Sequence, residues 1–175
     1  NDEQKTALSK KYTNDSEAEK LYIQGRVYWN ERSLDGLKKS IEYFEQALKR
    51  DPNYALAYVG LADSYQLLAE YKGLSTNEAY SKARINVTKA LELDPDLAEA
   101  HNSLAYIQAF FDWDWTRGEA SFKRAIELNP NYATAYHWYS ELLYVEHRFD
   151  EAEKQLNLAL ELDPSSASIQ SDVPH

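Results

Sequence analysis

The chain has 175 residues, enough for one domain or a short repeat array. It has too few Gly and Pro, five of each, for a turn-rich β-sandwich, and the absence of Cys excludes disulfides, thiol catalysis and Cys-ligated metal. A net charge of −10 disfavours direct binding to nucleic acid, whose phosphates this surface repels. No apolar run approaches the roughly 18 residues of a membrane span, so we expect no membrane insertion by this segment. Because the chain lacks Met even at position 1, we expect it to be a piece of a longer protein.

Four proline junctions divide the sequence into segments of similar length. Pro52, Pro95, Pro130 and Pro164 each follow an Asp or Asn at the end of a helical pattern, and their spacings are 43, 35 and 34 residues. A period of this size indicates a repeat array, in which each repeat buries its apolar face against its neighbours. We therefore expect an all-helical protein.

In chain order, the register of the repeats predicts a flanking segment, four hairpins and the start of a fifth. Residues 1–15 are polar and are expected to form a linker or a flanking helix. The domain spans 16–166, with repeats at 18–54, 55–97, 98–132 and 133–166, and residues 167–175 are the truncated start of a fifth repeat. The second repeat has about nine extra residues near 71–74, which predicts a longer hairpin there.

Small and large residues recur at fixed offsets in each repeat. The first helices contain Leu21…Gly25…Tyr28, Tyr58…Ala62…Tyr65, His101…Ala105…Gln108 and Tyr136…Ser140…Leu143. The second helices contain Ser40, Ala83, Gly118 and Ala152, each followed seven residues later by Ala47, Ala90, Ala125 or Ala159. Small residues let two helix backbones approach, and large residues fill the groove beside them. Capping boxes predict helix starts at Ser16, Ser75, Asp96, Thr116 and Asp150.

This pattern resembles the tetratricopeptide repeat (TPR), which is about 34 residues long. The resemblance implies an all-α fold, an α-α superhelix of helical hairpins wound as a right-handed solenoid. Residues 22–30 (YIQGRVYWN), 111–115 (FDWDW) and 129–139 (NPNYATAYHWY) are similar to the C-terminal TPR region of multidomain bacterial regulators. In that family a winged-helix domain, an adenylate cyclase or a Ser/Thr kinase precedes a TolB-like region and these repeats. The resemblance implies a bacterial regulatory setting and places any output domain upstream of this chain.

The first helices of a TPR stack line its concave face, where aromatic and polar side chains suit a peptide or a protein segment. The candidate peptide-binding residues, all expected to be exposed, are Tyr22, Arg26, Trp29, Asn30, Asp63, Gln66, Asn102, Tyr106, His137, Glu141 and Tyr144. The alternative is that several of these aromatics pack against neighbouring helices. The positions of a carboxylate clamp hold Tyr22, Arg26, Gly60, Glu99 and Ser103, and a single cation argues against recognition of a chaperone tail.

Other candidate sites receive structural interpretations. We expect Trp113 and Trp115 to pack inward and lock a turn, with an aromatic binding loop as the alternative. The four histidines are His101, His137, His147 and His175, and we expect none to pair with a second His or a carboxylate at the spacing of a zinc site. His101 is expected to be a satisfied packing residue. There is no nucleophile motif and no Gly-rich phosphate loop, so we expect no catalytic residue, no cofactor and no metal.

The leading hypothesis is a protein–protein interaction module, a scaffold or sensor of a bacterial signalling or transcription regulator. The alternative is an accessory domain of a larger enzyme, whose groove holds a small ligand or a substrate. We expect a cytoplasmic location, or a periplasmic one if the parent protein has an upstream membrane span. The last helix, near 151–162, has an apolar stripe too wide for one neighbouring hairpin to cover. It predicts a weak homodimer through the C-terminal end, with a folded-back tail as the alternative.

Overall fold

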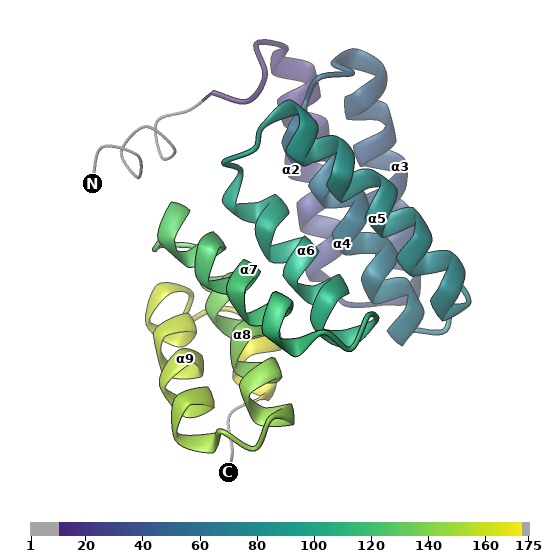
Figure 1. The fold of residues 1–175 in the computed structure, drawn as a ribbon. Coiled ribbons are helices and arrows are strands. Elements are labelled where there is room, and N and C mark those ends of the chain that lie inside the picture. Colours follow the sequence, from purple (N-terminus) through teal and green to yellow (C-terminus); the bar gives the residue numbers. More distant parts are fainter. Residues whose placement is uncertain (1–10, 173–175) are drawn as a thin grey trace.

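The computed structural model describes residues 11–172, and these residues form helices without a strand. Four antiparallel hairpins are followed by a short helix: α2 (Ser16–Asn30) with α3 (Leu34–Arg50), α4 (Ala55–Glu70) with α5 (Thr76–Leu93), α6 (Ala98–Phe110) with α7 (Trp115–Leu128), α8 (Ala133–Val145) with α9 (Phe149–Leu162), and then α10 (Ala167–Ser171). The hairpins stack in chain order along the molecule (Figure 1). The expected α-α superhelix is confirmed, whereas the ends of the two flanking segments, 1–10 and 173–175, lie outside the described residues.

The junctions between hairpins all use the same two hydrogen bonds. The carboxylate or amide oxygen before each Pro accepts from the backbone N–H two residues later, as in Asn53 N to Asp51 Oδ1 at 3.0 Å; the other pairs are Asp96–Asp94, Asn131–Asn129 and Ser165–Asp163. Each Pro carbonyl lies against a side chain six residues later, in the next helix; the pairs are Tyr58–Pro52, His101–Pro95, Tyr136–Pro130 and Gln170–Pro164, at 2.6–3.1 Å. Pro ends one helix and these bonds fix the start of the next. The ring of His101 therefore has a hydrogen-bond partner, as expected, and the bond from Gln170 extends the pattern to α10.

Close contact between neighbouring first helices depends on glycine. The ring of Phe44 on α3 is fully buried and lies against Gly25 on α2 and Gly60 on α4. A Cβ added to either glycine would stand 2.5–2.6 Å from a ring carbon of Phe44. No glycine among residues 11–172 has a positive φ, so this close approach, and not backbone freedom, requires glycine here.

The second hairpin is longer than the third, as the insertion predicts. Helices α4 and α5 have 16 and 18 residues, against 13 and 14 in α6 and α7. The last turns of α4 therefore project beyond the end of α6 and bring Glu70 and Tyr71 beside the C-terminal helices, where they line a hollow described below. None of the helices in the described region is long and apolar enough to cross a bilayer.

Candidate functional site

The first helices α2, α4, α6 and α8 share one side of the array, and the candidate residues lie on them. Six of these residues are buried, contrary to expectation: Trp29, Asp63, Gln66, Asn102, Tyr106 and His137, with exposed fractions of 0–7%. Tyr22, Arg26 and Glu141 are half-buried, whereas Asn30 and Tyr144 are exposed. Trp29 and Tyr106, the aromatics among the buried six, both pack against Trp138 on the neighbouring helix α8, as the alternative interpretation held.

Pairing between neighbouring first helices explains the burial of the polar candidates. The guanidinium of Arg26 on α2 donates to Asp63 Oδ2 on α4 at 2.9 Å, and the Ser103 hydroxyl on α6 donates to Asp63 Oδ1. Gln66 Nε2 on α4 donates to the Ser103 carbonyl at 3.0 Å. Burial raises the pKa of Asp63, and the adjacent Arg26 opposes this shift. Three helices are thus joined by one buried polar network, which occupies Arg26 internally.

Aromatic rings close the middle of the same face. The Trp138 ring on α8 lies 4.7 Å from the ring of Tyr106 on α6 and 6.3 Å from that of Trp29 on α2. This contact joins the first hairpin to the fourth, which are more than a hundred residues apart in sequence. The curvature of the stack therefore brings α2 across to α8 and covers side chains that a flatter array would leave open.

Some buried polar atoms have no hydrogen-bond partner in the described part of the chain. Both amide atoms of Asn102, Oε1 of Gln66 and the indole nitrogen of Trp29 belong to this group. Each unpaired buried polar group costs roughly 1–3 kcal/mol. These atoms lie on α2, α4 and α6, so the interior of the concave face contains unused hydrogen-bonding capacity.

A hollow of about 380 Å³ opens at the end of the face, near α10. Its walls come from the ends of α2 and α4, from α6 and α8, and from α10; they include Asn30, Arg32, Glu70, Tyr71, Tyr106, His137, Glu141 and Asp172. Sequence reasoning named Asn30, Tyr106, His137 and Glu141 but missed the others, because Arg32, Tyr71 and Asp172 follow the helix ends and Glu70 ends α4. The insertion near 71–74 was the one available signal.

The hollow brings His137, Glu141 and Asp172 together, and this corrects the expectation that no His pairs with a carboxylate. His137 Nε2 lies 2.6 Å from Asp172 Oδ2 and 3.6 Å from Glu141 Oε1. Glu141 is four residues after His137 on α8, so the pair stands on one helix face. Burial lowers the pKa of His137, whereas burial and the carboxylates of Glu70 and Asp172 raise the pKa of Glu141 to about 8.

The turn between α6 and α7 differs from the expectation that its tryptophans pack inward. Trp113 is 72% exposed with a φ of 56°, and Trp115 is 37% exposed. The turn is held instead by Phe111, whose ring stacks on Tyr80 with centroids 4.8 Å apart, and by Asp112, which pairs with Arg84 at 2.6 Å. One Phe and one ion pair fix the turn and leave Trp113 free to face solvent.

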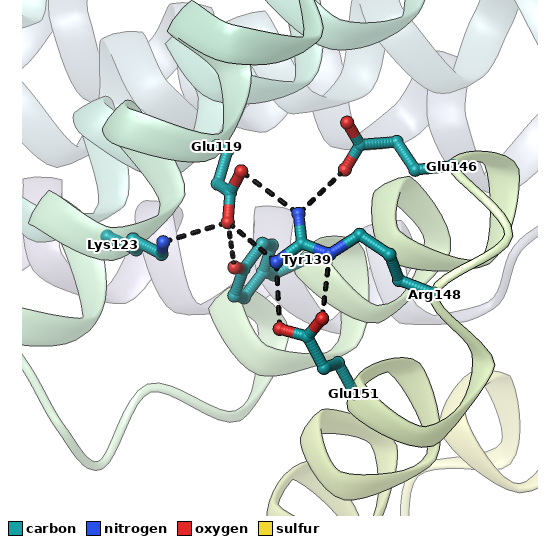
Figure 2. A network of polar contacts seen from close by, with 6 residues as sticks. All are labelled: Glu119, Lys123, Tyr139, Glu146, Arg148 and Glu151. Carbon is teal, nitrogen blue, oxygen red and sulfur yellow. Dashed lines mark hydrogen bonds and ion pairs between the residues drawn. The ribbon is translucent and has the colours of Figure 1, made fainter.

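A network of ion pairs on the other side fixes the last hairpin to the third. The Arg148 guanidinium, at the start of α9, donates to Glu119 on α7 with both terminal nitrogens at 3.1 Å, and also to Glu146 and Glu151 (Figure 2). Glu119 accepts further bonds from Tyr139 at 2.6 Å and from Lys123 at 2.8 Å. The bond from Arg148 is the main reason why the pKa of Glu119 falls to about 2.

Comparisons with known proteins agree with this architecture. Family models of the tetratricopeptide repeat match residues 18–54 and 114–171. The transcriptional regulator HilA of Salmonella typhimurium is 27% identical over 148 residues, which are 85% of this chain and 27% of HilA. A DnaJ homolog subfamily C member 7 homolog of Dictyostelium discoideum is 23% identical over 163 residues, 89% of this chain and 29% of that protein. The chain thus spans less than a third of either relative's length.

Solved structures share the fold. TTC0263, a thermophilic TPR protein of Thermus thermophilus, superimposes with a TM-score of 0.69 at 23% identity, covering 90% of this chain and 80% of its own. PilW, a type IV pilus biogenesis factor, gives 0.62 at 22% identity, covering 86% and 64%. The hairpins, their stacking and these matches define an α-α superhelix of the kind that serves as a protein–protein interaction module. The chain belongs to the tetratricopeptide-repeat family.

Proposed function

We propose that this chain is the interaction module, a scaffold or sensor, of a bacterial signalling or transcription regulator, and that it binds a peptide or protein segment on its concave face. The likeness to HilA over 85% of the chain supports the regulatory setting. TPR repeats are typically non-enzymatic scaffolds, which supports the absence of a catalytic role. The charge of −10 supports a basic or neutral partner and no direct contact with nucleic acid.

The observation that carries the proposal is the hollow at the α10 end of the concave face. Side chains from five helices converge there, and Asn30, Glu70 and Tyr71 on its rim are exposed. Polar and aromatic groups of this kind can contact both the backbone and the side chains of an extended segment. Toward α2 the buried charged groups Arg26 and Asp63 are already paired with each other. We therefore place the main partner contacts at the α10 end.

A peptide-display selection followed by fluorescence titration tests this proposal. Tyr71→Ala and Tyr144→Ala remove exposed aromatics from the α4 and α8 ends of the face, at exposed fractions of 38% and 63%. Each should weaken a selected peptide by about tenfold, the effect of a loss of about 1.4 kcal/mol. Ile85→Ala on α5, a second helix, is the matched control because Ile85 is 70% exposed. Binding that tolerates both tyrosine changes but is lost with Ile85→Ala would place the partner on the other face.

The small-ligand alternative has one observation in its favour. A hollow of about 380 Å³ has the size of a small-molecule site, for which roughly 300–1,000 Å³ is typical. A thermal-shift screen of metabolites on the same protein separates the two functions. A metabolite that raises Tm and loses its effect in Tyr71→Ala, together with failure of every peptide to bind, would favour the accessory ligand-binding domain.

A further inference from the structure

Three side chains in the hollow have the donor atoms of a metal site. His137 is 4% exposed and offers an imidazole nitrogen, and Glu141 and Asp172 offer carboxylate oxygens. These three donor atoms all lie within 4.8 Å of one another. We propose that His137, Glu141 and Asp172 bind a divalent transition-metal ion such as Zn²⁺, with the fourth position open to the hollow.

The His137–Glu141 distance fits metal coordination, whereas His137 and Asp172 are hydrogen-bonded to each other. Metal–donor bonds of roughly 2.0–2.1 Å in a tetrahedral site place neighbouring donor atoms about 3.3 Å apart. His137 Nε2 and Glu141 Oε1 are 3.6 Å apart, which is too far for a hydrogen bond. His137 Nε2 and Asp172 Oδ2 are 2.6 Å apart and need to separate only slightly. Since Asp172 caps α10 next to the hollow, a small shift of this short helix provides that movement.

The charges around the three donors also favour a cation. Glu70, on α4, is a third carboxylate facing the hollow, and its charge adds to that of Asp172 in disfavouring ionised Glu141. Arg32 is the cation that opposes them, and its guanidinium is stacked 3.8 Å over the Trp29 ring. A dication would balance the remaining negative charge.

Binding would tie α10 to α8, since Asp172 follows α10 and the other two ligands are on α8. Ile169 is the buried apolar anchor of α10 in the cluster with Tyr136 and Leu156. A metal bridge would replace the His137–Asp172 hydrogen bond as the second anchor of this helix. It would hold the wall of the hollow in place and shape the concave face at the position where we propose that partners bind. The metal proposal does not depend on that partner.

Isothermal titration of tag-free protein with Zn²⁺ alone tests the site. We expect saturable binding of one ion per chain, weakened more than about tenfold by Asp172→Asn and by Glu141→Gln. Both changes keep the side-chain shape, and Asp172 is 47% exposed, so the fold should survive. His147→Ala and His101→Ala are the matched histidine controls and should bind as the parent chain does. Hydrogen exchange within 167–172 should slow when Zn²⁺ is added.

Three results of these titrations would contradict the metal site. Absence of saturable binding below about 100 µM Zn²⁺, a weak affinity for a site with imidazole and carboxylate donors, would overturn the proposal. Equal affinity in Asp172→Asn and Glu141→Gln, or loss of binding in either histidine control, would overturn it as well.

Discussion

The contact of Phe44 with Gly25 and Gly60 makes a sharp test of how neighbouring hairpins pack. Alanine at either glycine would place a Cβ 2.5–2.6 Å from the ring, which is fully buried between the helices. Overpacking of this kind costs roughly 1–3 kcal/mol. Alanine favours a helix over glycine by about 1 kcal/mol and offsets part of that cost. Because a Cβ contact below 3.0 Å belongs to the upper part of the overpacking range, about 2–3 kcal/mol, the net destabilisation expected for Gly25→Ala and for Gly60→Ala is about 1–2 kcal/mol.

The two changes should interact because both added Cβ atoms would press on the same ring, near its Cε1 and Cζ atoms. In a single variant the ring meets one added Cβ, whereas in the double variant it meets two at once and cannot relieve both contacts by one movement. The free energy of unfolding of the double variant should therefore fall by more than the sum of the two single losses, with an excess of about 0.5 kcal/mol or more. In a Phe44→Leu background the smaller side chain frees this space. There each Gly→Ala change should be neutral or stabilising by up to about 1 kcal/mol, the gain in helix propensity.

Urea unfolding followed by circular dichroism and by Trp fluorescence measures these differences. Coincidence of the two transitions must be checked, because repeat arrays can unfold in steps. Gln24→Ala, beside Gly25 and exposed on α2, is the control and should change stability by less than about 0.5 kcal/mol. If the Gly→Ala variants were as stable as the parent chain, or if Phe44→Leu failed to rescue them, the packing argument would be refuted.

Three further predictions concern the C-terminal half. Arg148 lowers the pKa of Glu119 to about 2, so the stabilisation by the ionised Glu119 carboxylate is complete above the ordinary pKa near 4.5 and is lost as pH falls toward 2. Glu119→Gln should therefore lower the free energy of unfolding by about 1–3 kcal/mol at pH 7 and flatten the loss of stability between pH 4.5 and 2. Urea unfolding at several pH values measures both effects. Ala152 is 6% exposed, so Ala152→Leu should overpack the last hairpin and lower the free energy of unfolding by about 1–3 kcal/mol. An unchanged melting curve would contradict the packing of α9. The chain should form a weak homodimer through its C-terminal end, detectable by sedimentation at high concentration, and Leu162→Glu should abolish this dimer. A chain that stays monomeric at every concentration would favour α10 as the cover of that end.

The repeat could be identified from sequence because its signals are local. Pro junctions, small residues and large residues at fixed offsets all lie within one hairpin or between two consecutive ones. Helix starts were less predictable, and only Ser75 caps its helix as the capping boxes indicate, accepting from Glu78 N at 3.3 Å. Helices α2 and α7 begin one or two residues earlier than expected, capped by Asp15 and Asp114. Leu97 and Arg148 precede α6 and α9 without a side-chain cap, because the Asp-Pro turn and the Arg148 ion pairs fix these starts instead.

The candidate site was less predictable because its geometry depends on the curvature of the whole stack. Position in the repeat correctly placed the candidate residues on first helices, but it could not show that α2 reaches α8. The Trp29–Trp138 contact spans the array, and no pattern within one repeat encodes it. Polar side chains expected to face a partner, such as Asp63, face each other for the same reason. The His137–Glu141 spacing was visible in the sequence, but Asp172 completes the group only through the fold.

The two ends of the concave face should differ in how easily they open, and this difference determines where a partner can be accommodated. At the α2 end, separating Arg26 from Asp63 would leave a fully buried carboxylate without its cation, at a cost of roughly 3–5 kcal/mol. At the other end, α10 has only five residues and is held by one buried side chain, Ile169, and by the His137–Asp172 hydrogen bond. A hydrogen bond to a carboxylate that is 47% exposed and one apolar anchor can be broken at a lower cost than a buried ion pair. Opening should therefore start at α10, expose the hollow first, and reach the unpaired amide of Asn102 only if a bound segment extends along the face.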